Sequence, residues 1–423
     1  SLPPMVDWPQ DLRDAIGNHK YLAHGGHEFD GRPISNPDEN ELREIARQIQ
    51  DEGIRSIAVS SVFSPVNSEF EQETAELLQE EIEGVAVTLS HEIGRIGLLE
   101  RENAAIMNAC LQDLGKKTIS AFRGAVRELN IDAPLYLTQN DGTLMSSEFA
   151  EKYPIFTFSS GPTNSMRGAA FLSGLQEAMV VDIGGTTSDV GALTHGFPRE
   201  ASVTVKIGGV RTNFRMPDVY SFGLGGGSLV VDNPLQIGPQ SVGYELTQRA
   251  LVFGGSELTA SDIAVAAGLA DFGDRGAVSD LNTTFVGEAV EHMKRIVEEA
   301  VDRMKISAEP IPVIVVGGGS ILIGEKLKGA SEMIMPDHYP VANAVGAAIA
   351  QISGEVDRVF ALSEMSRGEA LEQAKEEARE RAISAGADPK TVEVVDVEDV
   401  PLTYLPGNAT RIRVKAVGDL KLA

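Results

Sequence analysis

The sequence predicts an α/β fold organised in more than one domain. Strands and helices alternate in the first part of the chain, with helices expected at 36–52 and 68–83 and strands at 54–63 and 84–89. This alternation is typical of a β-α-β unit with a parallel pair of strands. The chain has 423 residues, more than one small core requires, and its hydrophobic fraction of 42% is that of a globular protein.

Changes in composition along the chain predict three domains, at 1–157, 158–354 and 355–423. The first holds the β-α-β unit, and the last is a small α+β appendage. Further elements are expected as helices at 104–129, 261–267, 287–304, 341–352 and 363–387, and as strands at 133–138, 178–183, 186–194, 312–316, 392–397, 402–404 and 409–416, with two short strands within 201–215.

The charge balance excludes one class of partner. The chain has 36 Lys and Arg against 62 Asp and Glu, a formal net charge of −26, which repels a nucleic-acid backbone. Its single cysteine excludes a disulfide framework and a multi-cysteine metal site. No apolar run approaches the roughly 20 residues that span a bilayer, so the sequence predicts a cytoplasmic protein without a membrane segment.

The first of three glycine clusters follows a buried strand, as Asp182-Ile183-Gly184-Gly185-Thr186-Thr187-Ser188-Asp189. Glycines allow backbone N–H groups to approach an anion closely, and Thr186 and Thr187 add hydroxyl donors. Asp182 and Asp189 are compatible with phosphate only if Mg²⁺ lies between them, bound in part through water. A hairpin with a Gly-Gly turn is the alternative, but the acids on both sides favour a phosphate site.

Two other clusters are weaker signals taken alone. Gly225-Gly226-Gly227-Ser228 is either a flexible loop or a place of close approach. Gly317-Gly318-Gly319-Ser320 follows an apolar strand, and ligands of parallel α/β sheets bind at the carboxyl ends of strands. A tight connection between a strand and a helix is the alternative there. None of the three clusters is a Walker loop or a G-x-G-x-x-G fingerprint in the required context.

The histidines are scattered, and no two have the spacing of a zinc pair on a helix. Two arginines, Arg95 and Arg101, lie near acidic residues, where ion pairs are a simpler interpretation than an anion site. The charged helix at 363–387 is interpreted as a solvated or partner-docking face.

Taken together, the first and third clusters resemble the second phosphate motif and the adenosine motif of the actin/sugar-kinase/Hsp70 ATPase superfamily. Several further motifs resemble the hydantoinase A/5-oxoprolinase family: Ser159-Ser160-Gly161-Pro162, Asp141-Gly142, Glu100-Arg101, Asn108-Ala109 and Val341-Ala342-Asn343-Ala344-Val345-Gly346-Ala347-Ala348. The resemblance implies actin/Hsp70-like (ribonuclease H-like) ATPase lobes, with mixed sheets flanked by helices, plus the C-terminal appendage.

The resemblance further implies an ATP-dependent hydrolase of cyclic amides such as hydantoin or 5-oxoproline, in which ATP phosphorylates the carbonyl oxygen. Mapped onto this chain, Asp182, Gly184, Gly185, Thr186 and Thr187 hold the β- and γ-phosphates and Mg²⁺, with Asp182 as metal ligand. Asp182 and Asp189 are the candidates for the general base. The segment Gly317-Gly318-Gly319-Ser320 faces the adenosine, and Gly225-Gly226-Gly227-Ser228 lies near the nucleotide or the substrate.

The resemblance also implies that the chain has a separate B-type hydantoinase subunit as its partner and assembles into an oligomer. The family's first phosphate motif would lie upstream of Ser1, so the chain is expected to lack part of the first lobe and to turn over no ATP alone. Two alternatives stay open: a small-molecule kinase of the same superfamily, and a non-catalytic nucleotide-binding relative.

Overall fold

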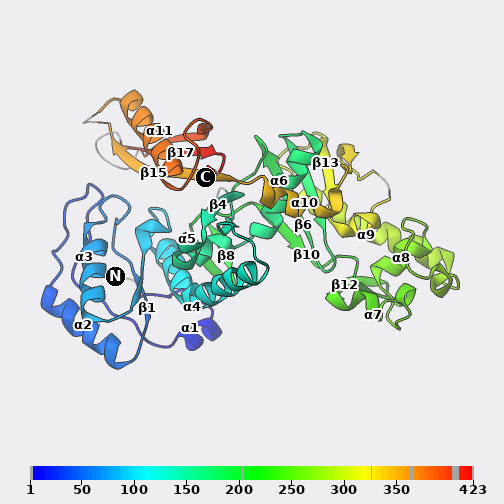
Figure 1. Ribbon diagram of the computed structural model, residues 1–423, viewed down its shortest axis with the longest axis horizontal. Helices are drawn as coiled ribbons and strands as arrows, with labels where there is room; N and C mark the ends of the chain where they lie inside the picture. The colour runs from blue at the N-terminus through cyan, green and yellow to red at the C-terminus, as the bar shows by residue number, and fades with distance from the viewer. Residues whose placement is uncertain (1–2, 202–203, 325, 363–364, 403–408, 422–423) are drawn as a thin grey trace. The chain divides into compact units, whose positions relative to one another are not determined.

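The computed structural model describes residues 3–201, 204–324, 326–362, 365–402 and 409–421, and it divides into two compact units (Figure 1). Unit 1 comprises Ser1–Phe158, Ala201–Met216 and Gln351–Ala423, and unit 2 comprises Ser159–Glu200 and Pro217–Ala350. The strand expected at 402–404 and its following turn lie almost entirely outside the described residues. Among the described helices, none combines the length and hydrophobicity that crossing a bilayer requires.

The predicted β-α-β unit is confirmed at the start of unit 1. Strands β1 (Ser56–Val59) and β2 (Ala86–Leu89) pair in parallel, and α3 (Glu69–Glu81) connects them. The helix α2 (Glu39–Asp51) packs with α3 over this pair through a core that includes Leu42, Ile49 and Leu78. The parallel pairing brings the carboxyl ends of β1 and β2 to the same edge.

Unit 1 also contains one long helix and several short elements. Helix α4 (Leu98–Glu128) begins earlier than predicted, directly after Gly97, and its first turn carries Glu100. An acidic side chain in the first turn is stabilised by the positive end of the helix dipole. The remaining elements there are α1 (Gln10–Ile16), α5 (Ser147–Lys152), β8 (Val205–Ile207) and β9 (Val210–Thr212).

The five-stranded sheet of unit 1 joins distant parts of the chain, in the order β16-β17-β15-β4-β3. The C-terminal strands β15 (Gln351–Ala361), β16 (Glu393–Pro401) and β17 (Ala409–Gly418) therefore share one sheet with β3 (Tyr136–Thr138) and β4 (Thr143–Ser146). Helix α11 (Arg367–Ser384) covers one face with alanines at i, i+4 spacing, Ala370, Ala374, Ala378 and Ala382. Small side chains at this spacing allow close approach of the helix to the sheet.

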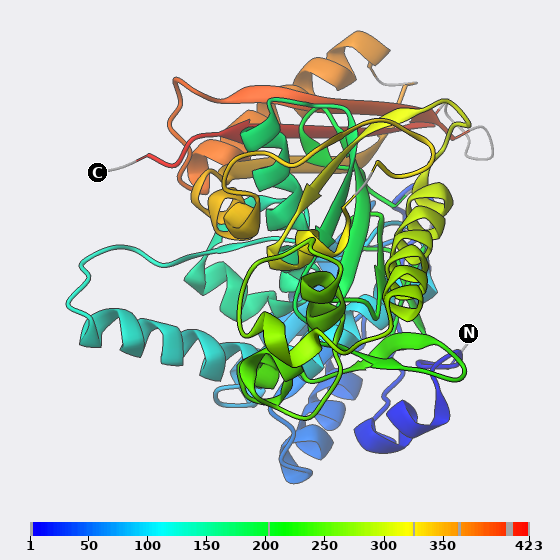
Figure 2. The same ribbon diagram turned by 90° about the vertical axis from the view of Figure 1, so that its right-hand side faces the viewer.

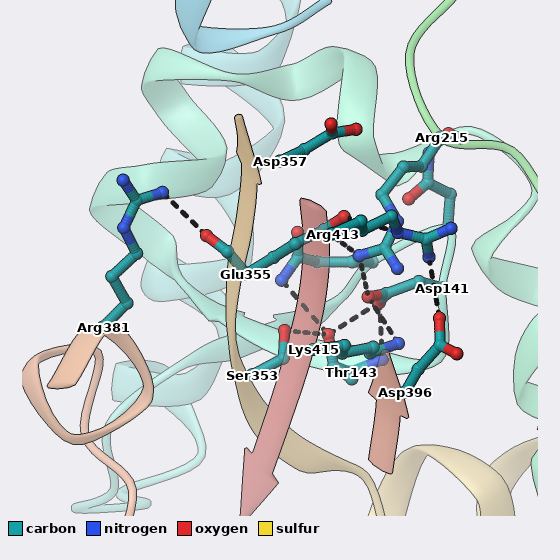
Figure 3. Close-up of polar contacts among 12 residues, drawn as sticks. Asp141, Thr143, Arg215, Ser353, Glu355, Asp357, Arg381, Asp396, Arg413 and Lys415 are labelled. Carbon is teal, nitrogen blue, oxygen red and sulfur yellow. Dashed lines mark hydrogen bonds and ion pairs between the residues drawn. The ribbon is translucent and has the colours of Figure 1, made fainter. Parts of the chain in front are cut away.

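The opposite face of this sheet carries charge. Asp141, at the β3–β4 turn, is buried and accepts hydrogen bonds from the backbone N–H and the hydroxyl of Thr143 at 3.0 and 2.6 Å. Its other oxygen lies 2.9 Å from the Lys415 ammonium and 3.5 Å from the Arg215 guanidinium (Figure 3). Around them lie the ion-paired side chains of Glu355, Asp357, Asp396, Arg411 and Arg413.

Unit 2 is built on a sheet of order β10-β6-β5-β13-β14, with β7 paired to β6. Alternate residues of β5 (Ala178–Ile183) face two helical layers. Val181 and Ile183 pack with α8 (Ala260–Ala266) and α9 (Thr283–Met304), while Val180 packs with α6 (Ser160–Ser173) and α10 (Ala342–Ala348). Figure 2 shows α9 alongside the sheet. The other strands are β6 (Ser188–Thr194), β7 (Phe197–Pro198), β10 (Val219–Phe222), β13 (Ile311–Val316) and β14 (Ala330–Ile334).

Sequence patterns missed three features of unit 2. Helix α6 is rich in small and polar residues because it packs closely on α10, where a Cβ on Gly168 would lie 1.9 Å from the carbonyl oxygen of Ala342. The helix expected at 341–352 ends at Ala348, since β15 begins at Gln351. A hairpin of β11 (Ser228–Val231) and β12 (Gln236–Ser241) follows the second glycine cluster.

Candidate functional site

The first glycine cluster forms the tip of the β5–β6 hairpin. The loop is closed by a hydrogen bond from the Gly184 N–H to the Thr187 carbonyl at 2.9 Å. Gly185, Thr186 and Thr187 are exposed, whereas Ser188 is buried and donates its hydroxyl to the carbonyl of Leu224 at 2.7 Å. A fixed loop with an exposed, nearly side-chain-free backbone offers N–H groups and hydroxyls to a ligand oxyanion.

The second cluster packs directly beneath this loop. The N–H groups of Gly226 and Gly227 donate to the carbonyls of Gly184 and Gly185 at 3.0 and 2.7 Å. A Cβ on Gly225 would lie 2.5 Å from the backbone nitrogen of Thr186, so a side chain there would displace the loop. The hydroxyl of buried Ser228 accepts from the Gly225 N–H at 2.9 Å. Glycine is therefore required at this contact by close backbone approach.

The third cluster lies against the other side of the loop. Strand β13 runs parallel to β5 with Val316 opposite Asp182, and the chain then turns at Gly317, where φ is 90°. A Cβ on Gly317 would lie 2.2 Å from the carboxylate of Asp182, and one on Gly319 would lie 2.6 Å from the Gly184 carbonyl. Gly318 is exposed, and buried Ser320 donates its hydroxyl to the Gly317 carbonyl at 2.8 Å. The three clusters thus meet within unit 2.

Two carboxylates lie at the base of the loop, on facing positions of β5 and β6. Burial raises the pKa of Asp182, opposed by a hydrogen bond from Ser165. Burial also raises the pKa of Asp189, and the nearby charge of Asp182 raises it further. A hydrogen bond from Ser221 acts in the opposite direction. Within the described part of the chain, neither carboxylate has an ion pair with Lys or Arg. Their charges are therefore left for a cation to neutralise.

The donor set fits Mg²⁺ bound together with phosphate. No group of three or more His, Cys, Asp or Glu side chains able to hold a metal occurs among the described residues. Mg²⁺ retains several waters and uses one or two carboxylates plus substrate phosphates, so it does not need such a group. Asp182 offers a carboxylate of the preferred kind beside a loop suited to phosphate, and Asp189 faces it from β6.

Two serines and an asparagine support the acids and were missed as site residues. Asn343, in α10, donates to the Gly161 carbonyl at 2.8 Å and to the hydroxyl of buried Ser165 at 3.2 Å. Ser165 in turn bonds Asp182, and Ser221 of β10 donates to Asp189. Gly161 and Asn343 lie in motifs that carry the family resemblance, which was the available signal. The pairing of α6 with α10 was not readable from sequence.

Two family models match the chain. One, described as Hydantoinase/oxoprolinase, matches residues 101–274, and the other, described as Hydantoinase/oxoprolinase N-terminal region, matches residues 3–82. Together they cover more than half of the chain, and the first includes the β5–β6 loop and the second glycine cluster.

Curated relatives give the same picture at low identity. The chain is 30% identical over 250 residues to the acetophenone carboxylase gamma subunit of Aromatoleum aromaticum, covering 56% of this chain and 34% of the relative. It is 26% identical over 290 residues to the caprolactamase subunit alpha of Pseudomonas jessenii, covering 67% and 40%. The chain therefore spans about a third to two fifths of the length of these relatives.

Solved structures share the fold. The ATP-dependent caprolactamase from Pseudomonas jessenii matches with a TM-score of 0.74 and 18% identity, over 94% of this chain and 69% of that one. A nucleotide-free acetone carboxylase matches with a TM-score of 0.65 and 16% identity over the same fractions. At such identities the likeness speaks for the fold alone, and it confirms the predicted fold class.

Proposed function

The chain belongs to the hydantoinase/oxoprolinase family, and from this premise we propose that it is the ATP-binding subunit of an enzyme that hydrolyses cyclic amides. Hydantoin, 5-oxoproline and related lactams are the proposed substrates. The observation that supports this most strongly is the convergence, on the β5–β6 loop, of three glycine clusters and two carboxylates that form no ion pair with any described Lys or Arg. Such a loop suits the phosphates of a nucleotide.

The proposed role of ATP follows from the chemistry of the amide. An unstrained amide is a poor electrophile, so water opens it slowly. Transfer of the γ-phosphoryl group to the carbonyl oxygen makes the carbon electrophilic and releases ADP. Water then adds to that carbon and the C–N bond breaks, leaving an acyl phosphate that a second water hydrolyses to a carboxylate and inorganic phosphate. Phosphoryl transfer depends mainly on positioning and charge neutralisation.

In this proposal each part of the loop has a role. The backbone of Gly184 and Gly185 and the hydroxyls of Thr186 and Thr187 bind the β- and γ-phosphates. The third cluster, Gly317-Gly318-Gly319-Ser320, faces the adenosine, and the second, Gly225-Gly226-Gly227-Ser228, supports the loop from below. Asp182 holds Mg²⁺, which neutralises phosphate charge when bound.

Asp189 is the proposed proton acceptor for the attacking water. A carboxylate bound to a cation is a weak base, which argues against giving that role to Asp182. The raised pKa of Asp189, caused by burial and by the charge of Asp182, brings it closer to the neutral range in which a general base works best.

A second candidate is ATP-dependent carboxylation of a ketone, because the relative with 30% identity is the acetophenone carboxylase gamma subunit. The same loop would bind ATP in that case. The acetophenone carboxylase and caprolactamase relatives are each named as a subunit, and on this basis we propose a B-type partner subunit for this chain as well.

The test is ATP hydrolysis by the full-length protein with its partner subunit and Mg²⁺. Hydantoin, 5-oxoproline and caprolactam are compared with acetone and acetophenone in bicarbonate. Stimulation by a cyclic amide with ring opening is the expected result, and stimulation by a ketone selects the carboxylase instead. A phosphorylated product without ring opening indicates a kinase, and absence of ATP binding in calorimetry indicates a non-catalytic relative.

One substitution tests the assignment of the loop. Asp182→Asn removes the proposed metal ligand while keeping the shape of the side chain, and we expect turnover to fall by about 100-fold or more, the scale of one lost charge-stabilising group. Asp280→Asn, at an exposed position of unit 2, is the matched control and should keep wild-type turnover. Unchanged turnover in Asp182→Asn would refute the assignment.

A further inference from the structure

The C-terminal half of α4 is held on unit 1 by one of its faces. On that face Ile119 is buried in a hydrophobic cluster with Met145. Arg123, one turn further along the same face, donates a hydrogen bond to the carboxylate of Glu151 at 2.8 Å. These contacts fix the direction of the helix and therefore also the direction of its opposite face.

The opposite face is exposed and almost entirely apolar. Because successive residues of a helix are rotated by about 100°, seven exposed side chains fall within an arc of roughly 120° and along about 28 Å of helix. This surface, here called the α4 stripe, consists of Cys110, Leu114, Thr118, Ala121, Phe122, Ala125 and Leu129. The three largest of these side chains, Leu114, Phe122 and Leu129, are 63%, 51% and 70% exposed.

Another helix of the same unit shows how different this face is from an ordinary solvated one. The exposed residues of α2 are all polar, and they are Glu39, Asn40, Glu44, Arg47, Gln48, Gln50 and Asp51. A surface helix normally directs its apolar residues to the core and its polar residues to water. Contiguous exposed apolar side chains mark an interaction surface instead, so the α4 stripe indicates a protein partner.

The α4 stripe is symmetric about its own centre, which falls between positions 121 and 122. Leu114 and Leu129 lie equally far from this centre in opposite directions, and so do Thr118 and Ala125. An antiparallel second copy of the helix would therefore bring leucine against leucine at both ends and small side chains against each other between them. A surface that is complementary to itself in this way suits a two-fold contact between identical chains.

The charges beside the stripe fit the same arrangement. Lys117 and Glu128 both border the stripe on one edge, and a two-fold axis at its centre brings the same edges of two copies together. Their mean position is one residue from the centre, or about 1.5 Å along the helix, so Lys117 of each copy faces Glu128 of the other. Positions 113–132 contain four basic and three acidic residues, a net charge of +1 in a chain of −26. Two acidic chains can therefore meet at this segment with little local repulsion, since salt screens their more distant charges.

We propose that the α4 stripe is the contact between two antiparallel copies of this chain, related by a two-fold axis. The leucines and Phe122 bury apolar surface in the contact, and the two pairs of Lys117 with Glu128 set its direction. The contact is independent of the proposed function, because the α4 stripe contains no residue of the β5–β6 loop.

The experiment measures the mass of the full-length protein in solution, alone and with its B-type subunit, by light scattering and sedimentation. We expect the wild-type chain alone to have the mass of two copies. Leu114→Glu combined with Leu129→Glu places like charges in the contact, which should raise the dissociation constant of the dimer about 100-fold or more. The melting temperature of each monomer should stay unchanged, because both leucines are exposed. Leu22→Glu is the matched control, since Leu22 is also 63% exposed in unit 1 but lies outside the stripe.

A charge reversal tests the antiparallel direction. Lys117→Glu alone replaces two ion pairs by two repulsions and should weaken the dimer by about tenfold. Adding Glu128→Lys to the same chain restores opposite charges across the two-fold axis and should return the wild-type affinity.

Three results would overturn the inference. The first is a monomeric wild-type chain, and the second is a double leucine variant that remains a dimer. The third is a double leucine variant that loses the B-type subunit while two copies of the chain stay together, because the α4 stripe would then bind that subunit. Failure of Glu128→Lys to rescue Lys117→Glu would contradict the antiparallel arrangement.

Discussion

Unit 1 and unit 2 each hold carboxylates at a sheet, but the surroundings shift the pKa values of these carboxylates in opposite directions. Burial alone would raise the pKa of Asp141, yet the charges of Lys415 and Arg215 and a bond from Thr143 hold it well below its ordinary value. Asp182 and Asp189 are half-buried, and burial is the main cause that raises the pKa of both, with no Lys or Arg among the described residues paired to offset it. One centre is neutralised by the protein and the other is left anionic.

The difference separates a structural role from a functional one. A buried ion pair whose partners are all supplied by the chain fixes strands in place, and here it ties β17 to the β3–β4 turn (Figure 3). A buried acid pair without a counter-charge costs stability unless something else supplies the cation. Proteins accept such a cost mainly at functional sites.

The largest change in stability is expected in unit 1, when the neutralised carboxylate of Asp141 is removed. Asp141→Asn leaves the buried charges of Lys415 and Arg215 without their central anion, and removal of one partner from a buried pair costs about 3–5 kcal/mol. For a unit of this size we expect the thermal midpoint to fall by roughly 6–20 °C, as measured by calorimetry. An unchanged midpoint would contradict the structural role of Asp141.

The corresponding substitution in unit 2, of Asp182, should change stability in the opposite direction. Because folding raises the pKa of Asp182, the folded state binds its proton more tightly than the unfolded state does. Stability contributed by this group is therefore present at low pH and lost as pH rises from the unfolded pKa, about 3.9, through the folded value. Asp182→Asn mimics the protonated form, so without nucleotide its thermal midpoint should rise by a few degrees at pH 7 and lose that advantage near pH 4.

The control for this sign reversal is Asp141→Asn measured over the same range. The lowered pKa of Asp141 gives stability above the unfolded pKa that is lost as pH falls, so the cost of its substitution should shrink in acid. Parallel pH dependence of the two variants would show that the two centres do not differ as described.

Sequence reasoning located the glycine clusters because each follows a strand and combines glycine with acids or hydroxyls. It also predicted most strands and helices of both units from their hydrophobic patterns. It missed α6 because a helix packed on α10 through Gly168 and Ala342 needs small residues, which read as a loop. It treated the C-terminal strands as an appendage, whereas they share a sheet with β3 and β4, since strand pairing over long sequence separations leaves no local pattern.

The site residues show the same difference between local motifs and contacts made by distant segments. Asp182 and Asp189 were accessible to motif reasoning, but the supports Ser165, Ser221 and Asn343 come from separate elements that only packing brings together.

The most direct test of the central claim uses glycines that the protein itself leaves room around. A Cβ on Gly185 or Gly318 would meet no protein atom within 4 Å, and neither has a left-handed backbone, so alanine there should not disturb the fold. If the loop binds ATP, that Cβ meets the ligand. We predict that Gly185→Ala and Gly318→Ala keep the wild-type melting temperature but weaken Mg-ATP binding by the full-length protein by about tenfold or more in calorimetry, which is about 1.4 kcal/mol. Gly287→Ala, on the exposed face of α9 with the same free space, should bind ATP as the wild type does, and wild-type affinity in all three variants would contradict the claim.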